Sequence, residues 1–352
     1  MMKRIALSVM ASPLMSASLL LGGCVMPTLA IAAAEKAPPQ AVQTSLAGSR
    51  YVAIGSSFAA GPQLPPPKPG GPARCGQSVN NYPTLLAERF GMVLVDRTCS
   101  GATTDHVLGP WSEIPPQLAS VTADTRLVTV TIGGNDLSYI GNLFSADCAY
   151  RARIVAATGS KTRACGPVRV PAEADYVRDE AQLSEIARRV RAAAPQALLV
   201  FVQYLTPLPP AGKLCAATPI SETDAALVRE IGKRLAEITA RVAAANGAVA
   251  VEMNQFSATH TPCDPAPWMI GSPENYDGSQ GLQWHLNKAG MAATAEGIAA
   301  WLIKDGVKPV KASVTSEPGN ARPAPTMPAP GAPAPADRVP TGASTPQPSG
   351  NR

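Results

Sequence analysis

A serine and a histidine in this chain supply the side chains that nucleophilic acyl transfer needs. Ser57 follows the short apolar run Y-V-A-I and the residues Gly55 and Ser56, and His285 is one of only three histidines among 352 residues. A serine hydroxyl becomes a good nucleophile when a base takes its proton, and histidine suits that task best near neutral pH. We therefore take Ser57 as the candidate nucleophile and His285 as the candidate base.

Two further residues could stabilise the negative charge that develops on a carbonyl oxygen under attack. The backbone N–H of Gly101 can approach an oxyanion closely because glycine has no side chain. Asn135, within the sequence G-G-N-D, can donate its side-chain amide. With the N–H of Ser57 these groups would make three donors, and loss of one such donor typically costs about 10²–10³ in rate. Structural interpretations stay open, as a tight turn for Gly101 and as a cap or turn residue for Asn135.

The other two histidines, His106 and His260, are interpreted as structural, because a lone histidine is more often structural than catalytic. The chain has no C-x-x-C or H-x-x-x-H pair, so zinc is not expected. It has no P-loop and no G-x-G-x-x-G sequence, so no nucleotide cofactor is implied. The lack of a G-x-S-x-G elbow disfavours the α/β-hydrolase fold. We expect chemistry without metal or cofactor.

Strands that alternate with helices must position these residues. Short apolar stretches predict strands over residues 51–54, 92–98, 126–132, 197–203 and 248–252. Helical spacing and capping residues predict helices over 78–90, 173–194, 221–245 and 286–304. A short helix is expected over 115–121, Asp136 is a candidate cap of a helix towards Phe144, and 150–170 is expected to be irregular. This alternation predicts one three-layer α/β/α domain around a central five-stranded parallel sheet.

Four short blocks lie at or near the carboxyl ends of these strands, where open α/β sheets bind their ligands. They are G-S-S at 55–57, S-G-A at 100–102, G-G-N-D at 133–136 and W-H-L-N at 284–287. In this order they resemble the blocks of the SGNH (GDSL-type) hydrolase family, over roughly residues 50 to 305. The resemblance implies the flavodoxin-like SGNH fold and a serine esterase. Its nucleophile would be Ser57 and its base His285, with Ser57, Gly101 and Asn135 forming the oxyanion hole.

The chain departs from the family pattern at two positions. Ser56 stands where the family has the Asp of G-D-S, and Leu282 stands where it has the Asp that orients the histidine. Some members use a backbone carbonyl at the second position and so form a Ser–His dyad. The resemblance therefore implies the Leu282 carbonyl as the group that orients His285, with the Asp277 side chain as the alternative. The secreted members with three disulfides and a dyad resemble this chain most closely.

The N-terminus and the cysteines indicate export. A basic start and an apolar stretch that ends in L-G-G-C predict a signal peptide over 1–24, whose end resembles a lipobox with Cys24 as the lipidated residue. Simple cleavage after the small residues at 30–34 is the alternative. The six other cysteines allow 15 connectivities, and we expect the sequential one. Those pairs are Cys75–Cys99, Cys148–Cys165 and Cys215–Cys263.

Composition limits the remaining possibilities. A net charge of +5 with no run of Lys and Arg gives no indication of nucleic-acid binding. Residues 25–48 are expected to form a tether, 49–308 the hydrolase domain and 309–352 a disordered tail rich in Pro and Ala. We expect a monomer in the periplasm or on the cell surface, attached to the membrane by its lipid, or alternatively a secreted protein.

The sequence thus favours an exported esterase or lipase that hydrolyses carboxylic esters through an acyl-serine intermediate. A small-molecule or lipid ester would be its substrate. Two alternatives stay open: a carbohydrate O-deacetylase of the same fold, and a non-catalytic envelope protein that binds glycan or lipid.

Overall fold

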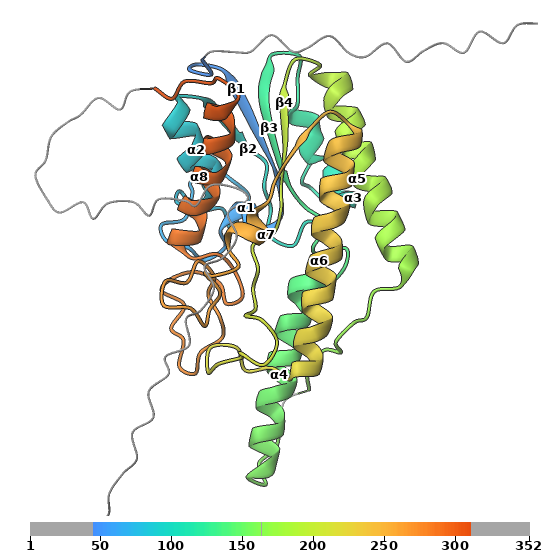
Figure 1. Cartoon of the computed structure of the whole chain (residues 1–352), viewed down its shortest axis with the longest axis vertical. Coiled ribbons are helices and arrows are strands. Elements are labelled where there is room, and N and C mark those ends of the chain that lie inside the picture. Colours follow the sequence, from blue (N-terminus) through green and yellow to red (C-terminus); the bar gives the residue numbers. More distant parts are fainter. Residues whose placement is uncertain (1–44, 163, 311–352) are drawn as a thin grey trace, which may run out of the picture.

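A parallel sheet of five strands forms the centre of the protein (Figure 1). The computed structural model describes residues 45–310 except 163. The strands are β1 (Arg50–Gly55), β2 (Val93–Asp96), β3 (Thr125–Thr131), β4 (Leu198–Val202) and β5 (Val249–Val251), in the spatial order β2-β1-β3-β4-β5. All neighbouring strands run parallel, as expected for apolar strands covered on both faces.

Helices cover both faces of this sheet. Figure 1 shows α2 (Tyr82–Phe90) and α8 (Lys288–Lys304) together on one side, and α5 (Glu173–Ala193) and α6 (Glu222–Ala245) on the other. The layering and the sheet confirm the three-layer α/β/α prediction. The strand order reverses at β1 and β3, and ligand sites of open sheets lie beyond the strand ends at that point.

Capping residues define where the long helices begin. The side chains of Asn81, Ser221 and Asn287 accept hydrogen bonds from backbone N–H groups three residues later, at 3.0, 3.1 and 2.9 Å. Each satisfies a donor that the first helical turn leaves unpaired. The predicted long helices are therefore present, although α2 begins four residues after its expected start and α8 two residues after.

The segment after β3 differs from the prediction. Helix α4 runs from Tyr139 to Ala157, where the sequence analysis expected irregular structure from residue 150. The run A-Y-R-A-R-I-V-A-A is dominated by good helix formers, and this propensity decides the structure of the segment. The prediction that Asp136 caps this helix is also wrong, because the N-cap of α4 is Ser138. The Asp136 carboxylate accepts a hydrogen bond from the N–H of Thr104 at 3.1 Å, at the start of a different helix, α3 (Thr104–Leu108).

Four further short elements complete the fold of the described residues, and the sequence predicted only one of them. They are α1 (Ser57–Ala60), α7 (Met253–Phe256) and two 3₁₀ turns, η1 (Ala73–Cys75) and η2 (Gln117–Ser120). Only η2 falls where a short helix was expected.

Three disulfides tie the loops, and they join the pairs in sequential order. Cys75 bonds Cys99, Cys148 bonds Cys165, and Cys215 bonds Cys263. Cys148 lies within α4 and not in a loop, so its bridge fixes the outer half of that helix to the segment that follows it.

The described domain extends slightly beyond the expected boundaries. Leu46 is fully buried, and Ser45 pairs with Lys308 in an isolated bridge, so both ends of the domain meet. The expected signal peptide, Cys24, most of the tether and nearly all of the tail lie outside the described residues. Within residues 45–310, no helix is both long and apolar enough to cross a membrane.

Candidate active site

Ser57 lies directly beyond the carboxyl end of β1. Gly55 closes that strand, and a Cβ there would stand 2.7 Å from the backbone oxygen of Thr131, so a larger residue cannot fit. The Gln117 side chain bonds both the N–H and the C=O of Gly55, at 2.8 and 3.1 Å. This fixes the turn from which Ser57 begins α1, with its side chain only slightly accessible.

His285 is brought to Ser57 from the far end of the chain. Its Nε2 lies 2.8 Å from the Ser57 hydroxyl oxygen. A backbone bond from Ile270 N–H to the His285 carbonyl, at 2.7 Å, holds the loop that precedes α8. The rings of Phe58 and Phe144 lie 5.5 and 6.2 Å from the imidazole, centre to centre, so the pair sits in largely apolar surroundings.

A backbone carbonyl orients the imidazole, but not the one expected. Nδ1 of His285 lies 2.8 Å from the carbonyl oxygen of Gln283. The Leu282 carbonyl instead accepts the backbone N–H of His285 at 3.2 Å, and Asp277 is exposed and accepts the N–H of Ser279. Trp284 has φ of 59°, and this left-handed turn brings the Gln283 carbonyl against the ring. The predictions for Leu282 and Asp277 are therefore wrong.

These contacts determine the protonation of His285. A carbonyl can only accept, so Nδ1 carries the proton and Nε2 is left as the acceptor for the Ser57 hydroxyl. Burial lowers the pKa of His285 to about 4, and the hydrogen bond to Gln283 opposes that shift. The imidazole is thus neutral at neutral pH, which is the form that can take a proton from serine.

Side chains that the sequence analysis missed hold Gln283 in place. Its amide Nε2 donates to the Ser272 hydroxyl at 3.0 Å, and that hydroxyl donates to the Asp147 carboxylate at 2.5 Å. Arg151, one helical turn further along α4, pairs with the same carboxylate at 2.7 Å. The loop that carries His285 is therefore bonded to α4. The spacing of Asp147 and Arg151 is typical of a helix pair, but nothing in it points to Ser272.

The expected oxyanion donors lie on two neighbouring turns. Gly101 has φ of 84°, a conformation that suits glycine, and Asn135 donates one amide hydrogen to the Ala102 carbonyl at 2.8 Å. An amide group carries two hydrogens, so the second stays available. Among the described residues, the N–H groups of Ser57 and Gly101 donate to no other group. Free donors of this kind are what an oxyanion requires.

Ser56, which replaces the family's Asp, has a partner of its own. Its hydroxyl lies 2.8 Å from that of Tyr204, and the Tyr204 oxygen also accepts the N–H of Gly134 at 3.2 Å. Tyr204 follows β4 and thus links the serine turn to the G-G-N-D turn. Ser57, and not Ser56, bonds the histidine.

The other two histidines make structural contacts. His106 accepts the N–H of Thr103 at 3.0 Å and stacks on Trp111 with ring centres 4.0 Å apart. His260 stacks on Trp268 at 3.8 Å. Among the described residues, no group of three or more His, Cys, Asp or Glu side chains could hold a metal ion.

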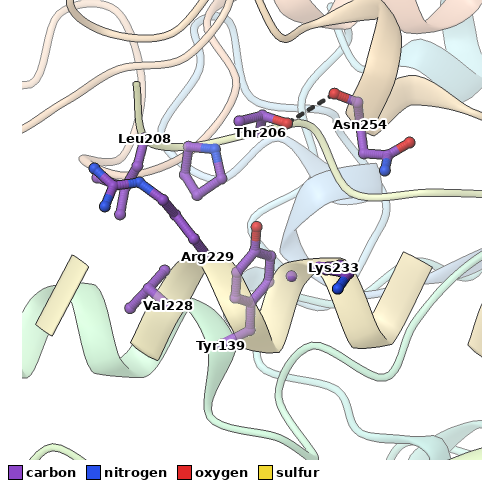
Figure 2. A pocket seen from close by; sticks show the side chains of 9 residues that line it. Tyr139, Thr206, Leu208, Val228, Arg229, Lys233 and Asn254 are labelled. Carbon is purple, nitrogen blue, oxygen red and sulfur yellow. Dashed lines mark hydrogen bonds between the residues drawn. The ribbon is translucent and has the colours of Figure 1, made fainter. Parts of the chain in front are cut away.

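Figure 2 shows a pocket beside α6. It lies between α6, the segment after β4 and α7, and Thr206 and Lys233 are among its lining residues. Neither member of the serine–histidine pair lines it. Its link to the site is Tyr139, which lines the pocket and whose ring meets that of Tyr204 edge-on at 5.9 Å.

Comparison with known proteins identifies the family. Residues 53–293 match the GDSL-like Lipase/Acylhydrolase family. The chain belongs to this family. Among its relatives, Lipase 2 of Streptomyces coelicolor is 32% identical over 238 residues, which are 66% of this chain and 78% of the relative. A lipase of Streptomyces rimosus is 29% identical over 222 residues, or 62% of this chain and 75% of the relative.

Solved structures share the fold of this GDSL-like hydrolase. Phospholipase A1 from Streptomyces albidoflavus superposes with a TM-score of 0.56 at 21% identity, covering 72% of this chain and 99% of the other. The extracellular lipase of Streptomyces rimosus gives a TM-score of 0.51 at 23% identity, with 72% and 99% covered. The family and the fold expected from the four blocks are confirmed, and so is the class of carboxylic ester hydrolase.

Proposed function

We propose that Ser57 is the nucleophile and His285 the general base of an ester hydrolase that acts through an acyl-serine intermediate. The observation that carries this proposal is the 2.8 Å contact between Nε2 of His285 and the Ser57 oxygen, with Nδ1 held by the Gln283 carbonyl. A neutral, oriented imidazole in contact with a serine hydroxyl is the arrangement that activates serine.

The reaction begins when the Ser57 oxygen attacks the ester carbonyl and its proton moves to Nε2 of His285. The carbonyl oxygen becomes an oxyanion, which the N–H groups of Ser57 and Gly101 and the free amide hydrogen of Asn135 stabilise. As the ester C–O bond breaks, the imidazolium gives its proton to the leaving alcohol. Water then attacks the acyl-serine with His285 as base, and the acid is released while Ser57 regains its proton.

Among the described residues, no carboxylate hydrogen-bonds His285. The Gln283 carbonyl fixes the tautomer and offers a dipole to the imidazolium that forms, but it carries no full charge. Burial among apolar rings also disfavours the imidazolium. The base is therefore weak and stays unprotonated well into the acidic range.

Lipid esters are the substrate class that we favour. The names of the relatives, lipases and a phospholipase A1, support this choice, as do the apolar rings of Phe58 and Phe144 around the imidazole. Three disulfides support export, because such bonds persist in oxidising compartments. We further propose that Cys24 is lipidated and holds the enzyme at a membrane.

Hydrolysis of p-nitrophenyl esters from acetate to palmitate tests the proposal, with labelling by a fluorophosphonate as a second readout. Ser57→Ala should abolish both labelling and hydrolysis, whereas Ser56→Ala should keep the labelling. Highest activity on acyl chains longer than acetate supports lipid esters as the substrate class. Activity on acetate alone favours an O-deacetylase. Undiminished labelling of Ser57→Ala would contradict the assigned nucleophile, and a folded protein inert on every ester would favour a binding role.

A further inference from the structure

The outer half of α4 extends beyond the body of the molecule. In Figure 1 this green helix continues past the lower end of α6, and its last turns have no neighbouring helix or strand. Residues 153–162 are all exposed. The Cys148–Cys165 disulfide joins the helix to the returning segment, so the projection is a tethered element and not a free end.

Apolar side chains continue along this projection where nothing covers them. Leu143 is fully buried in the core, and Tyr150 and Ile154 follow it at seven and eleven residues, which is the same helical face. Tyr150 is 36% exposed, Ile154 56% and Val155 39%. A soluble surface normally covers or avoids such a cluster, and exposed apolar patches commonly mark an interaction site.

The same segment is strongly basic. Residues 148–172 contain five Lys or Arg and no Asp or Glu. Arg151 pairs with Asp147 and Arg169 with Asp175, but Arg153 and Lys161 form no ion pair within the described residues. Exposed apolar side chains beside unpaired cations are typical of helices that bind at the surface of an anionic membrane.

This surface is connected to the proposed catalytic pair. Phe144, whose ring is 6.2 Å from that of His285, lies on the same helix ten residues before Ile154. At 1.5 Å per residue, the exposed cluster is about 15 Å along the helix from the site. Asp147 and Arg151 both hydrogen-bond the Ser272 hydroxyl, which joins the same helix to the loop that carries His285. A membrane that meets the outer half of α4 would therefore lie within reach of Ser57.

We propose that the outer half of α4 and the segment that follows it, through Tyr150, Ile154, Arg153 and Lys161, dock the enzyme on an anionic lipid surface. The inference deepens the proposed function and rests on it for its purpose, because it makes esters within a lipid surface the substrate. Charge complementarity selects the partner: the apolar side chains enter the headgroup region while the cations meet anionic headgroups.

Cosedimentation with vesicles tests the docking without catalysis. The protein used is the chain from residue 25 onwards, which lacks Cys24 and the apolar segment before it. It carries Ser57→Ala, so that it cannot consume the lipid, and is mixed with phosphatidylglycerol or phosphatidylcholine vesicles. It should bind the anionic phosphatidylglycerol vesicles at least tenfold more tightly than the phosphatidylcholine vesicles. Tyr150→Ser with Ile154→Ser, and separately Arg153→Glu with Lys161→Glu, should each weaken that binding at least tenfold.

Matched controls lie at the start of β2 and at the end of α8, far from α4 (Figure 1). Val93→Ser with Ile303→Ser removes two other exposed apolar side chains, and Lys304→Glu with Lys308→Glu makes the same change in net charge. Both should bind like the parent. Equal binding by the α4 variants and the parent, or no preference for phosphatidylglycerol, overturns the proposal.

A second readout separates this proposal from the catalytic one. With Ser57 restored, the α4 variants should hydrolyse soluble p-nitrophenyl butyrate at the parent rate but hydrolyse phosphatidylglycerol vesicles at least tenfold more slowly. A parent that binds vesicles through α4 yet hydrolyses no ester contradicts the proposed function alone. An active parent whose vesicle hydrolysis does not depend on α4 contradicts the docking alone.

Discussion

The carbonyl oxygen of Gln283 lies 2.8 Å from Nδ1 of His285 and is the group that orients the base. A backbone acceptor thus takes the position that a carboxylate holds in a catalytic triad. Because substitution of the Gln283 side chain leaves that carbonyl in place, the arrangement must be tested through its neighbours.

Asp277 is the acidic residue that the sequence offers for this role, and its replacement should have no effect. It is exposed and bonds the N–H of Ser279 at 2.9 Å. We expect Asp277→Asn to keep kcat/KM for p-nitrophenyl butyrate within about twofold, whereas loss of an orienting carboxylate in a triad costs about 10⁴. A large loss of kcat in a folded Asp277→Asn protein would restore the triad interpretation.

Ser272 should act as a positioning residue. Its hydroxyl joins the Gln283 amide to the Asp147 carboxylate, so Ser272→Ala frees the Gln283 side chain and leaves a buried carboxylate with one fewer donor. We expect kcat to fall about tenfold with KM nearly unchanged, since a small misplacement of a catalytic group slows the chemical step. The exposed Ser279→Ala in the same loop is the control. Equal kcat values for the two variants would show that the link to α4 does not position the base.

The pH profile reports the burial of His285. Its folded pKa of about 4 means that the imidazole loses its proton as pH rises through 4 and acts as a base above that value. We expect kcat/KM to rise through about pH 4 and then stay level to neutrality. A base with the ordinary histidine pKa near 6.5 would give this rise at a pH two units or more higher. Near-ultraviolet circular dichroism at each pH checks that the protein stays folded. An apparent pKa near 6.5 would mean that the imidazole is solvated.

Asp179 should make the protein less stable as pH rises. Its carboxyl is buried behind Gly133 with no hydrogen-bond partner among the described residues. Burial, and then the charges of Asp136 and Glu180, raise its pKa to about 8. Between about pH 4 and 8 the folded state keeps a proton that the unfolded state loses, so the free energy of unfolding falls by about 1.4 kcal/mol per pH unit.

Asp179→Asn should remove that slope, because an amide does not titrate in this range. Urea unfolding at pH 5, 6 and 7 measures it, with Asp175→Asn, an acid on the same helix, as the control for any other pH effect. Parallel pH dependence in Asp179→Asn and the parent would show that Asp179 is ionised in the folded state.

The sequence predicts those parts of the site that rest on strand ends and on side chains. Ser57 and Asn135 follow apolar strands whose carboxyl ends meet by necessity in a parallel sheet, so their proximity follows from the order of elements. The orienting group could not be predicted in this way. Every residue has a carbonyl, so the sequence does not single out that of Gln283. The direction of this carbonyl depends on the left-handed backbone at Trp284, and a tryptophan gives no indication of that conformation. Tyr204 and Ser272 escaped notice for a related reason, since their partners lie 148 and 125 residues away in the chain.

The Cys75–Cys99 bridge ends two residues before Gly101, and the N–H of Ser100 between them bonds the Cys75 carbonyl at 3.0 Å. The turn that would present an oxyanion donor is thus linked by a disulfide to the loop beside it. A newly made chain has free thiols and lacks this link. We therefore expect it to be an inactive precursor that does not attack the esters of the cell that makes it. Oxidation of one pair of thiols would then be the maturation step, with competence for catalysis acquired only where disulfides form.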